Sequence, residues 1–498
     1  MSALQFLALD LGAESGRGVL GSFDGDRLAL RDVHRFPNGP VRVLDSMHWD
    51  ALRLFSEMQQ AVGRAVEQAG DDLVGMGVDT WGVDFGLLGA GDVLLGNPYH
   101  YRDERTVGMV EEACKRVPRA EIFGYSGIQF MELNTLFQLF AMSHRRSPLL
   151  EMAETLLMMP DLFNFWFTGV KASEFSIATT TQFYDPRKGD WSLELLDRLG
   201  IPTHFLTPIV PPGHKLGGLV KPLAESTGAK GLTVVAPAGH DTGSAVAAVP
   251  AATPDYAYIS SGTWSLMGVE IAEPIVNEQA LRYNFTNEGG VCGTFRFLKN
   301  IMGLWLVQES RREWQRQGDD YSYDDITRMA AEAPAFEAVV EPDDPSFLRP
   351  GDMPARLAEF CTRTGQTPPQ TRGGIVRCAL ESLALKYRWV LNCLEELRGK
   401  RLEAVHIVGG GTQNRLLNQF AADAMNRPVI TGPIEATATG NILMQAIALG
   451  HLASLDDARQ VVRNSFEVAT YEPQNPAPWD EAYECYLRLS ATPADSGA

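Results

Sequence analysis

The stretch VVAPAGHDTGSAVAAV, residues 234–249, decides how the rest of this chain is interpreted. Its first residues predict a short buried strand, 237–240 predict a sharp turn, and the small residues from Thr242 onward predict a helix that packs closely on a sheet. Asp241 therefore stands at a helix N-terminus, where backbone N–H groups and the helix dipole favour an ionised carboxylate. We interpret Asp241 as a candidate base, with an ordinary N-cap as the alternative.

A glycine-rich turn lies near the N-terminus, in LALDLGAESGRGVLGSF, residues 7–23. The pattern predicts two strands joined by a tight turn, with Asp10 at the end of the first strand. The backbone beside the glycines, together with Ser15 and Arg17, can hold a phosphate group. The spacing matches neither G-x-x-x-x-G-K-[ST] nor a dinucleotide fingerprint, and such a hairpin alone is more often only a turn.

A polar cluster with an aromatic residue occurs in GVDTWGVDFGLL, residues 77–88. Asp79, Thr80, Trp81 and Asp84 follow a predicted strand over 73–78. Polar groups beside an aromatic ring suit a sugar, which has hydroxyls to bond and a C–H face to pack. A turn beside a core tryptophan explains the stretch equally well.

The second half of the chain begins like the first. Residues 256–260 and the following SSGTWSLMG predict a strand, a glycine turn containing Thr263 and a second strand. Further on, a strand over 402–408 runs into three glycines, 409–411, and then a helix, which suits a nucleotide or another anion. This weak internal symmetry predicts an α/β protein of two related domains, 1–248 and 249–490, that face each other across an active-site cleft.

Two apolar runs predict helices. One covers residues 156–167, and the other is FLKNIMGLWLVQES, residues 297–310, which carries Asn300 near its start and Gln308 further along. Taken singly, Asn300 is more often a cap and Gln308 a surface residue.

Composition restricts the class of protein. The 498 residues are enough for two domains, possibly three, and Lys+Arg 43 against Asp+Glu 62, a net charge of -19, gives no attraction to nucleic acid or an anionic membrane. Six cysteines without C-x-x-C spacing indicate reduced thiols and no zinc site, although Cys361 and Cys378 are spaced so that they can approach each other. Because the first apolar run lacks a basic leader and no run is long enough for a bilayer, we expect a cytoplasmic protein.

Taken together, LALDLGAESGR, GVDTWGVDFGLL, AGHDTGSAV, SSGTWSLMG and HIVGGGTQNRLLNQ resemble the FGGY family of carbohydrate kinases, from Leu7 to about Asn441. Within that family, DTWGVDF, YRDERT, TNEGG and LKNIMGLWL are similar to the members that phosphorylate L-rhamnulose. The resemblance implies two actin-like (ribonuclease-H-like) domains of the hexokinase/actin superfamily, with a sugar and ATP between them.

The resemblance also implies roles for individual residues. Asp241 is the catalytic base, and Asp10 lies near Mg²⁺. The residues implied at the sugar are Gly82, His240, Asp241, Thr242 and Asn300, the last near the sugar or the nucleotide. Those implied at ATP are Ala13, Glu14, Ser15, Gly16, Arg17, Thr263, Gln308 and Gly410. Glu14 departs from the family pattern of a small polar residue, and since a carboxylate repels phosphates, we expect it to turn away from ATP.

The implied reaction is ATP-dependent phosphorylation of L-rhamnulose at its C1 hydroxyl, in L-rhamnose catabolism, by a monomer or homodimer. A related deoxy-ketose such as L-fuculose is the alternative substrate, and a non-catalytic actin-like nucleotide-binding protein is the alternative class. A dinucleotide-dependent dehydrogenase is a further alternative class that the three-glycine turn suggests, although G-x-G-x-x-G and its downstream acid are missing.

Overall fold

The computed structural model describes residues 3–490 and divides into two compact units. Unit 1 takes the described residues within Met1–Pro250, Glu270–Leu298 and Glu435–Phe466, and unit 2 takes those within Ala251–Val269, Lys299–Ile434 and Glu467–Ala498. Neither unit is one continuous segment, whereas the predicted domains, 1–248 and 249–490, are.

A six-stranded sheet of order β13-β14-β6-β1-β2-β3 forms the centre of unit 1. Its strands are β1 (Leu4–Leu11), β2 (Ser15–Phe23), β3 (Leu28–Pro37), β6 (Leu73–Thr80), β13 (His214–Gly218) and β14 (Thr233–Ala236). β1 runs antiparallel to β2, with Asp10 opposite Arg17, and parallel to β6, with Asp10 opposite Asp79. The hairpin predicted for residues 7–23 is therefore confirmed.

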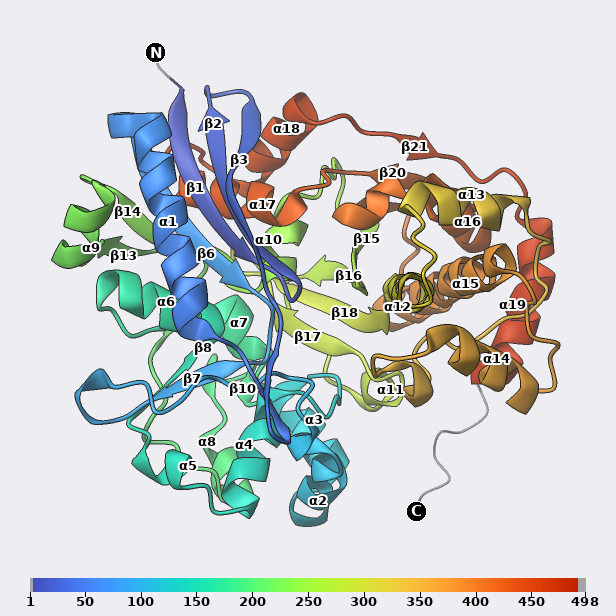
Figure 1. Ribbon diagram of the computed structural model, residues 1–498, viewed down its shortest axis with the longest axis horizontal. Helices are drawn as coiled ribbons and strands as arrows, with labels where there is room; N and C mark the ends of the chain where they lie inside the picture. The colour runs from blue at the N-terminus through green and yellow to red at the C-terminus, as the bar shows by residue number, and fades with distance from the viewer. Residues whose placement is uncertain (1–2, 491–498) are drawn as a thin grey trace. The chain divides into compact units, whose positions relative to one another are not determined.

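Helices cover both faces of this sheet (Figure 1). On one face, α1 (Ala51–Ala69) and α6 (Met159–Thr168) bury apolar side chains such as Leu54 and Phe163 against Leu7 and Leu9 of β1. On the other face lies α17 (Ala436–Ala448), and two glycines of β6 admit it: a Cβ on Gly77 would lie 2.7 Å from Asn441 Oδ1. A helix from late in the chain thus packs directly on the strands that end at Asp10 and Asp79.

The remaining elements of unit 1 surround the sheet. They are β4 (Val41–Val43), β5 (Ser46–His48), β7 (Phe85–Leu88), β8 (Thr155–Met158), β9 (Ser173–Glu174), β10 (Tyr184–Asp185), β11 (Asp190–Trp191), β12 (Ile209–Val210), α2 (Met109–Arg116), α3 (Arg119–Ser126), α4 (Thr135–His144), α5 (Pro148–Met152), α7 (Phe175–Thr179), α8 (Leu193–Leu199), α9 (Lys221–Thr227), α10 (Asp241–Ala247), α11 (Glu278–Arg282) and α18 (Leu455–Ser465). The helix predicted over 156–167 is wrong at its start, because residues 155–158 pair with β7 as strand β8. A short apolar run has no periodicity that separates a buried strand from a buried helix.

A seven-stranded sheet repeats the plan of the first, in the order β17-β18-β16-β15-β19-β20-β21. Its strands are β15 (Tyr256–Ser261), β16 (Trp264–Ile271), β17 (Thr286–Gly289), β18 (Phe295–Met302), β19 (Ala404–Val408), β20 (Val429–Thr431) and β21 (Thr470–Tyr471). β15 runs antiparallel to β16 and parallel to β19, β19 runs parallel to β20, and β20 runs antiparallel to β21. The same directions relate β1, β2, β6, β14 and β13, so the predicted duplication is confirmed.

The helices of unit 2 are α12 (Trp305–Arg316), α13 (Tyr323–Glu332), α14 (Met353–Arg363), α15 (Arg372–Arg398), α16 (Arg415–Met425) and α19 (Ala477–Ser490). α15 is a long helix that ends at Gly399, whose φ is 63°. The helix predicted over 297–310 is wrong in its first half, since residues 295–302 form strand β18 and α12 begins only at Trp305. Asn300 is therefore a strand residue and caps no helix.

Across residues 3–490, the longest apolar helices fall short of what crossing a membrane requires. The thiols of Cys361 and Cys378 are hydrogen-bonded, which confirms that this pair approaches. That hydrogen bond raises the pKa of Cys378, and burial raises it further.

Candidate active site

The turn before Asp241 is held by a buried glutamate. Glu174 Oε2 accepts hydrogen bonds from Gly239 N at 2.8 Å and from Ser176 Oγ at 2.6 Å. Ser176 Oγ in turn accepts from His240 N at 3.1 Å. Burial raises the pKa of Glu174, while these donors act in the opposite direction. The backbone that carries His240 and Asp241 is thus fixed by side chains from β9 and α7.

Asp241 is the first residue of α10, and its side chain is 31% exposed. Oδ1 accepts from Thr242 N at 2.6 Å and Thr242 Oγ1 at 3.2 Å, and lies 3.4 Å from His240 Nε2. Loss of water around the carboxyl raises the pKa of Asp241, the His240 ring lowers it, and Asp10 raises it. The helix terminus by itself would lower the pKa of Asp241, but desolvation outweighs it and the net direction is a rise. A raised pKa makes the carboxylate a stronger proton acceptor near neutral pH.

Three carboxylates gather where neighbouring strands end. Asp10 lies opposite Asp79 on the parallel strands β1 and β6, and Thr80 bridges to His240, next to Asp241. Asp79 is fully buried: Oδ2 accepts from Asn441 Nδ2 at 2.5 Å, and Oδ1 has no hydrogen-bond partner. Burial raises the pKa of Asp79 well above its ordinary value, and the charges of Asp10 and Asp241 raise it further.

Sequence reasoning placed Asp79 in the aromatic cluster with Trp81 and so missed its position beside Asp10. A signal for it exists, because LALD and MGVD are both apolar strands that end in aspartate. Carboxyl ends of neighbouring parallel strands meet at one edge of a sheet, which is where ligands of open α/β sheets bind.

Arg17 neutralises part of this charge. Its Nε and Nη2 donate to Asp10 Oδ2 at 3.1 and 2.9 Å, and its Nη1 pairs with Glu435, the residue before α17. Glu435 was not foreseen, since it lies far from Arg17 in the sequence. The Arg17 guanidinium thus lies between two carboxylates near the start of β2.

The tip of the β1–β2 hairpin is closed by backbone bonds. Gly12 N donates to Ser15 O at 2.9 Å, Ala13 is half-buried, and Glu14 is exposed. A Cβ on Gly16 would lie 2.3 Å from the Phe36 ring, so packing against Phe36 already requires glycine at this position.

The donor set at these strand ends fits a magnesium ion. Mg²⁺ prefers oxygen ligands and is usually held by one or two carboxylates together with phosphates and water. Asp10 and the unpartnered buried Oδ1 of Asp79 supply such oxygens. Within residues 3–490 no group of three or more His, Cys, Asp or Glu side chains is arranged to hold a metal ion by itself. Asp10 and Asp79 would share the coordination of such an ion with phosphate and water oxygens.

Gly82 lies against His240. A Cβ on Gly82 would lie 3.3 Å from His240 Nε2. The next residue, Val83, has φ 68°, a left-handed conformation that is strained for a β-branched residue. It is held because Val83 N donates to Thr180 Oγ1 at 3.2 Å and Thr135 Oγ1 donates to Val83 O at 2.6 Å. Such strain at a defined contact is typical of functional sites.

The Asp84 carboxylate accepts hydrogen bonds from groups in the protein interior. Its Oδ2 accepts from the indoles of Trp49 at 2.6 Å and Trp81 at 3.1 Å, whose ring centroids are 3.9 Å apart, and from Tyr101 N at 3.1 Å. Gln138 Nε2 donates to Oδ1 at 2.9 Å. Burial raises the pKa of Asp84 to about 6 despite these donors. Asp84 therefore binds the aromatic cluster together and has no exposed surface for a ligand.

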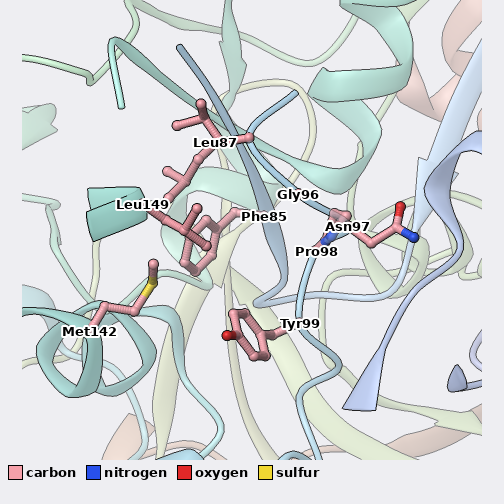
Figure 2. A pocket seen from close by; sticks show the side chains of 9 residues that line it. Phe85, Leu87, Gly96, Asn97, Pro98, Tyr99, Met142 and Leu149 are labelled. Atoms are coloured by element: carbon pink, nitrogen blue, oxygen red, sulfur yellow. The ribbon is translucent and has the colours of Figure 1, made fainter. Parts of the chain in front are cut away.

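A separate pocket in unit 1 lies beyond this cluster (Figure 2). Its walls are mainly apolar, from Phe85, Leu87, Tyr99, Met142 and Leu149, and its volume of ≈ 20 Å³ is that of about one water molecule. It is too small to hold a sugar.

Three of the predicted nucleotide residues, Thr263, Gln308 and Gly410, lie in unit 2. Thr263 O, in the β15–β16 turn, accepts from Gly303 N at 3.1 Å and Trp305 N at 3.2 Å, which joins this turn to the start of α12. Gln308 is on the second turn of α12, and its buried Oε1 has no hydrogen-bond partner. Asn300, on β18, belongs to the same unit.

The glycine loop after β19 lies beside the end of β15. A Cβ on Gly411 would lie 2.0 Å from Ser261 Oγ, whereas a Cβ on Gly410 would meet no atom within 4 Å. Gly410 thus presents open backbone next to the turn that carries Thr263. The structure gathers Thr263, Gln308 and Gly410 in unit 2, and Asp10, Arg17, Gly82 and 240–242 in unit 1.

Two family models match this chain. The model of the FGGY carbohydrate kinase N-terminal domain matches residues 5–248, and the model of the C-terminal domain matches residues 257–449. The chain belongs to the FGGY family of carbohydrate kinases, and the resemblance inferred from its motifs is confirmed.

Two similar proteins show which kinases of the family this chain resembles in sequence. The chain is 44% identical to a rhamnulokinase of Bacteroides thetaiotaomicron over 478 residues, 96% of this chain and 98% of the relative. It is 39% identical to a rhamnulokinase of Oceanobacillus iheyensis over 465 residues, 93% of this chain and 97% of the relative.

Solved structures confirm the two-domain α/β fold of these kinases. A ligand-bound xylulose kinase from Lactobacillus acidophilus matches with a TM-score of 0.80 at 16% identity, over 98% of this chain and 99% of that chain. A Plasmodium falciparum glycerol kinase with ADP matches with a TM-score of 0.76 at 15% identity, over 98% of both chains.

Proposed function

We propose that this protein transfers the γ-phosphate of ATP to the C1 hydroxyl of L-rhamnulose, giving L-rhamnulose 1-phosphate and ADP in L-rhamnose catabolism. One observation carries the proposal: a partly exposed carboxylate, Asp241, stands beside His240 in a chain 44% identical to a rhamnulokinase. The kinase class follows from family membership, and the substrate follows from these relatives.

On the sugar side, Asp241 accepts the proton of the attacking hydroxyl. Its raised pKa and its contact with Thr242 support this role, because a base must be both oriented and basic enough. His240, Thr242 and Gly82 contact the sugar from the same strand ends, and Asn300, on β18, is the residue proposed near the sugar or the nucleotide. Phosphoryl transfer needs positioning and charge neutralisation more than covalent chemistry, so these contacts matter as much as the base.

On the nucleotide side, residues 13–17 bind the phosphates and Thr263, Gln308 and Gly410 bind the rest of ATP. Arg17 is suited to phosphate because it already lies between two carboxylates and can exchange them for another anion. Glu14 is exposed, which supports an orientation away from ATP. Asp10 holds Mg²⁺, with Asp79 beside it. When bound, this ion would neutralise negative charge on the phosphates.

We place the activity in the cytoplasm, the compartment that supplies ATP and keeps thiols such as Cys361 and Cys378 reduced. A monomer or a homodimer is proposed as the active form.

The test is a panel of L-rhamnulose, L-fuculose, D-xylulose and glycerol, assayed for ATP-dependent ADP release, with the phosphorylated carbon located by NMR. L-Rhamnulose phosphorylated at C1 with the highest kcat/KM is the expected result. A preference for L-fuculose would move the proposal to the alternative deoxy-ketose. Nucleotide binding without release of ADP by any sugar would contradict a kinase and favour a non-catalytic actin-like protein.

A further inference from the structure

The His240 ring contacts a buried ion pair on the side away from Asp241. Arg296 Nη2 lies 3.1 Å from His240 Nδ1 and 3.2 Å from Glu288 Oε2, and Glu288 Oε2 lies 3.3 Å from the same ring nitrogen. Arg296 is fully buried, and its Nε donates to Gly289 O at 2.9 Å. Glu288 and Arg296 are directly opposite on β17 and β18, within residues 270–298 of unit 1.

This geometry decides which ring nitrogen carries the proton. A guanidinium has donors and no acceptor, so in the 3.1 Å contact Arg296 donates and His240 Nδ1 accepts. Since Nδ1 offers its lone pair, the single proton of the neutral ring is on Nε2. A ring protonated at Nδ1 would instead direct that N–H toward Glu288 Oε2 at 3.3 Å and lose the hydrogen bond from Arg296.

The proton on Nε2 points toward the base. Nε2 lies 3.4 Å from Asp241 Oδ1, and a Cβ on Gly82 would lie 3.3 Å from it. The ring therefore presents a donor next to the carboxylate acceptor, over a residue with no side chain. That pairing of one donor and one acceptor matches two neighbouring hydroxyls of a sugar.

We propose that Arg296, oriented by Glu288, is a positioning residue that fixes His240 as the Nε2–H tautomer, so that His240 donates to a sugar hydroxyl beside Asp241. This proposal rests on the proposed kinase function. It adds that the Nε2–H group of His240 selects the orientation of the sugar. In the opposite tautomer Nε2 would be an acceptor beside a carboxylate, and the substrate hydroxyl would lose its donor.

Removal of Arg296 alone would leave the Glu288 carboxylate buried and unpaired, which can prevent folding. The test therefore uses the double variant Glu288→Gln/Arg296→Met, which removes both charges, and Arg296→Lys, which keeps the pair. The matched control is Arg459→Lys, because Arg459 forms another buried pair of unit 1, with Glu270 at 2.5 Å.

We expect the double variant to lose about 10-fold in kcat/KM for L-rhamnulose, mainly through KM, as for one lost hydrogen bond. The KM for ATP and the ADP release without sugar stay unchanged, and Arg296→Lys recovers part of the loss. The control changes the melting temperature without changing the KM for sugar.

A second measurement reads the tautomer directly. The ¹⁵N shifts of the His240 ring, assigned by the signal lost in His240→Gln, should show a bare Nδ1 in the wild type and a mixture in the double variant. A wild-type ring protonated at Nδ1, or a folded double variant with unchanged KM for sugar, would overturn the proposal. A wild type inactive toward every ketose would instead contradict the kinase function itself.

Discussion

The two glycine turns of this protein have the same backbone plan and opposite chemistry. In unit 1, the β1–β2 hairpin ends in charged residues: Asp10 opposite Arg17, with Asp79 on the next strand. In unit 2, the corresponding β15–β16 hairpin ends with Ser261 opposite Ser265, and Ser265 is hydrogen-bonded to Tyr387 at 2.6 Å. The same edge of the sheet therefore carries charged side chains in unit 1 and neutral hydroxyl groups in unit 2.

The physical consequences of the two edges differ. The charge of Asp10 raises the pKa of Asp79 and of Asp241, and these carboxylates need a cation beside them, which Arg17 supplies in part. The glycines and hydroxyls of unit 2 carry no charge and allow close approach of a flat ring to the backbone. In the proposed kinase, proton transfer and the metal ion belong to the first edge and the nucleoside to the second.

The largest expected effect comes from neutralising the base. Asp241→Asn should lower kcat by about 10²–10⁴-fold, the usual contribution of a general base, while sugar and ATP still bind. Steady-state rates and calorimetric titrations with each ligand measure the two parts separately. Asp71→Asn, at an exposed aspartate of the same unit, is the matched control. Near-normal turnover by Asp241→Asn would remove Asp241 from its role as base.

The free energy of unfolding should also depend on pH because of Asp84 in unit 1. Its pKa is raised from 3.8 to about 6, so the folded state holds a proton that the unfolded chain has released between these values. Wild-type stability should therefore fall, by about 3 kcal/mol relative to Asp84→Asn, as the pH rises from about 3 to about 7. Denaturant unfolding of both proteins at several pH values measures the difference, and parallel curves would contradict it.

A pair of glycine substitutions tests the neutral edge. Gly411→Ala forces a Cβ to within 2.0 Å of Ser261 Oγ, whereas Gly410→Ala meets no atom within 4 Å. Gly411→Ala should lose about 1–3 kcal/mol of stability through overpacking. Gly410→Ala should keep the melting temperature and raise only the KM for ATP. Equal melting temperatures for the two variants would show that Ser261 yields to the added methyl group.

The smallest effect should follow from making the first turn as neutral as the second. Asp10→Asn removes one proposed ligand of the ion while Arg17 keeps its pair with Glu435. The Mg²⁺ concentration that gives half-maximal rate should rise by about 10-fold, with the KM for sugar unchanged. A magnesium titration at saturating ATP provides the measurement. An unchanged magnesium requirement would assign the ion to other oxygens.

Local patterns were sufficient for much of the fold. Strand–glycine–strand runs at residues 7–23 and 256–268 predicted both hairpins, and their similarity predicted the duplication. The patterns failed over 155–158 and 295–302, where an apolar run pairs as a strand. In both places the choice between helix and strand depends on a partner strand that the run itself does not contain.

The sequence by itself determined the family, the two hairpins and the position of Asp241 at the start of a helix, because these depend on motifs and periodicities within short segments. Only the tertiary structure brought Asp79 opposite Asp10, Glu435 to Arg17, and the Glu288–Arg296 pair to His240. The physical reason is that charge pairing and desolvation act through space. Residues far apart in the chain therefore set the pKa of Asp79 and the proton position on His240, and no local pattern records them.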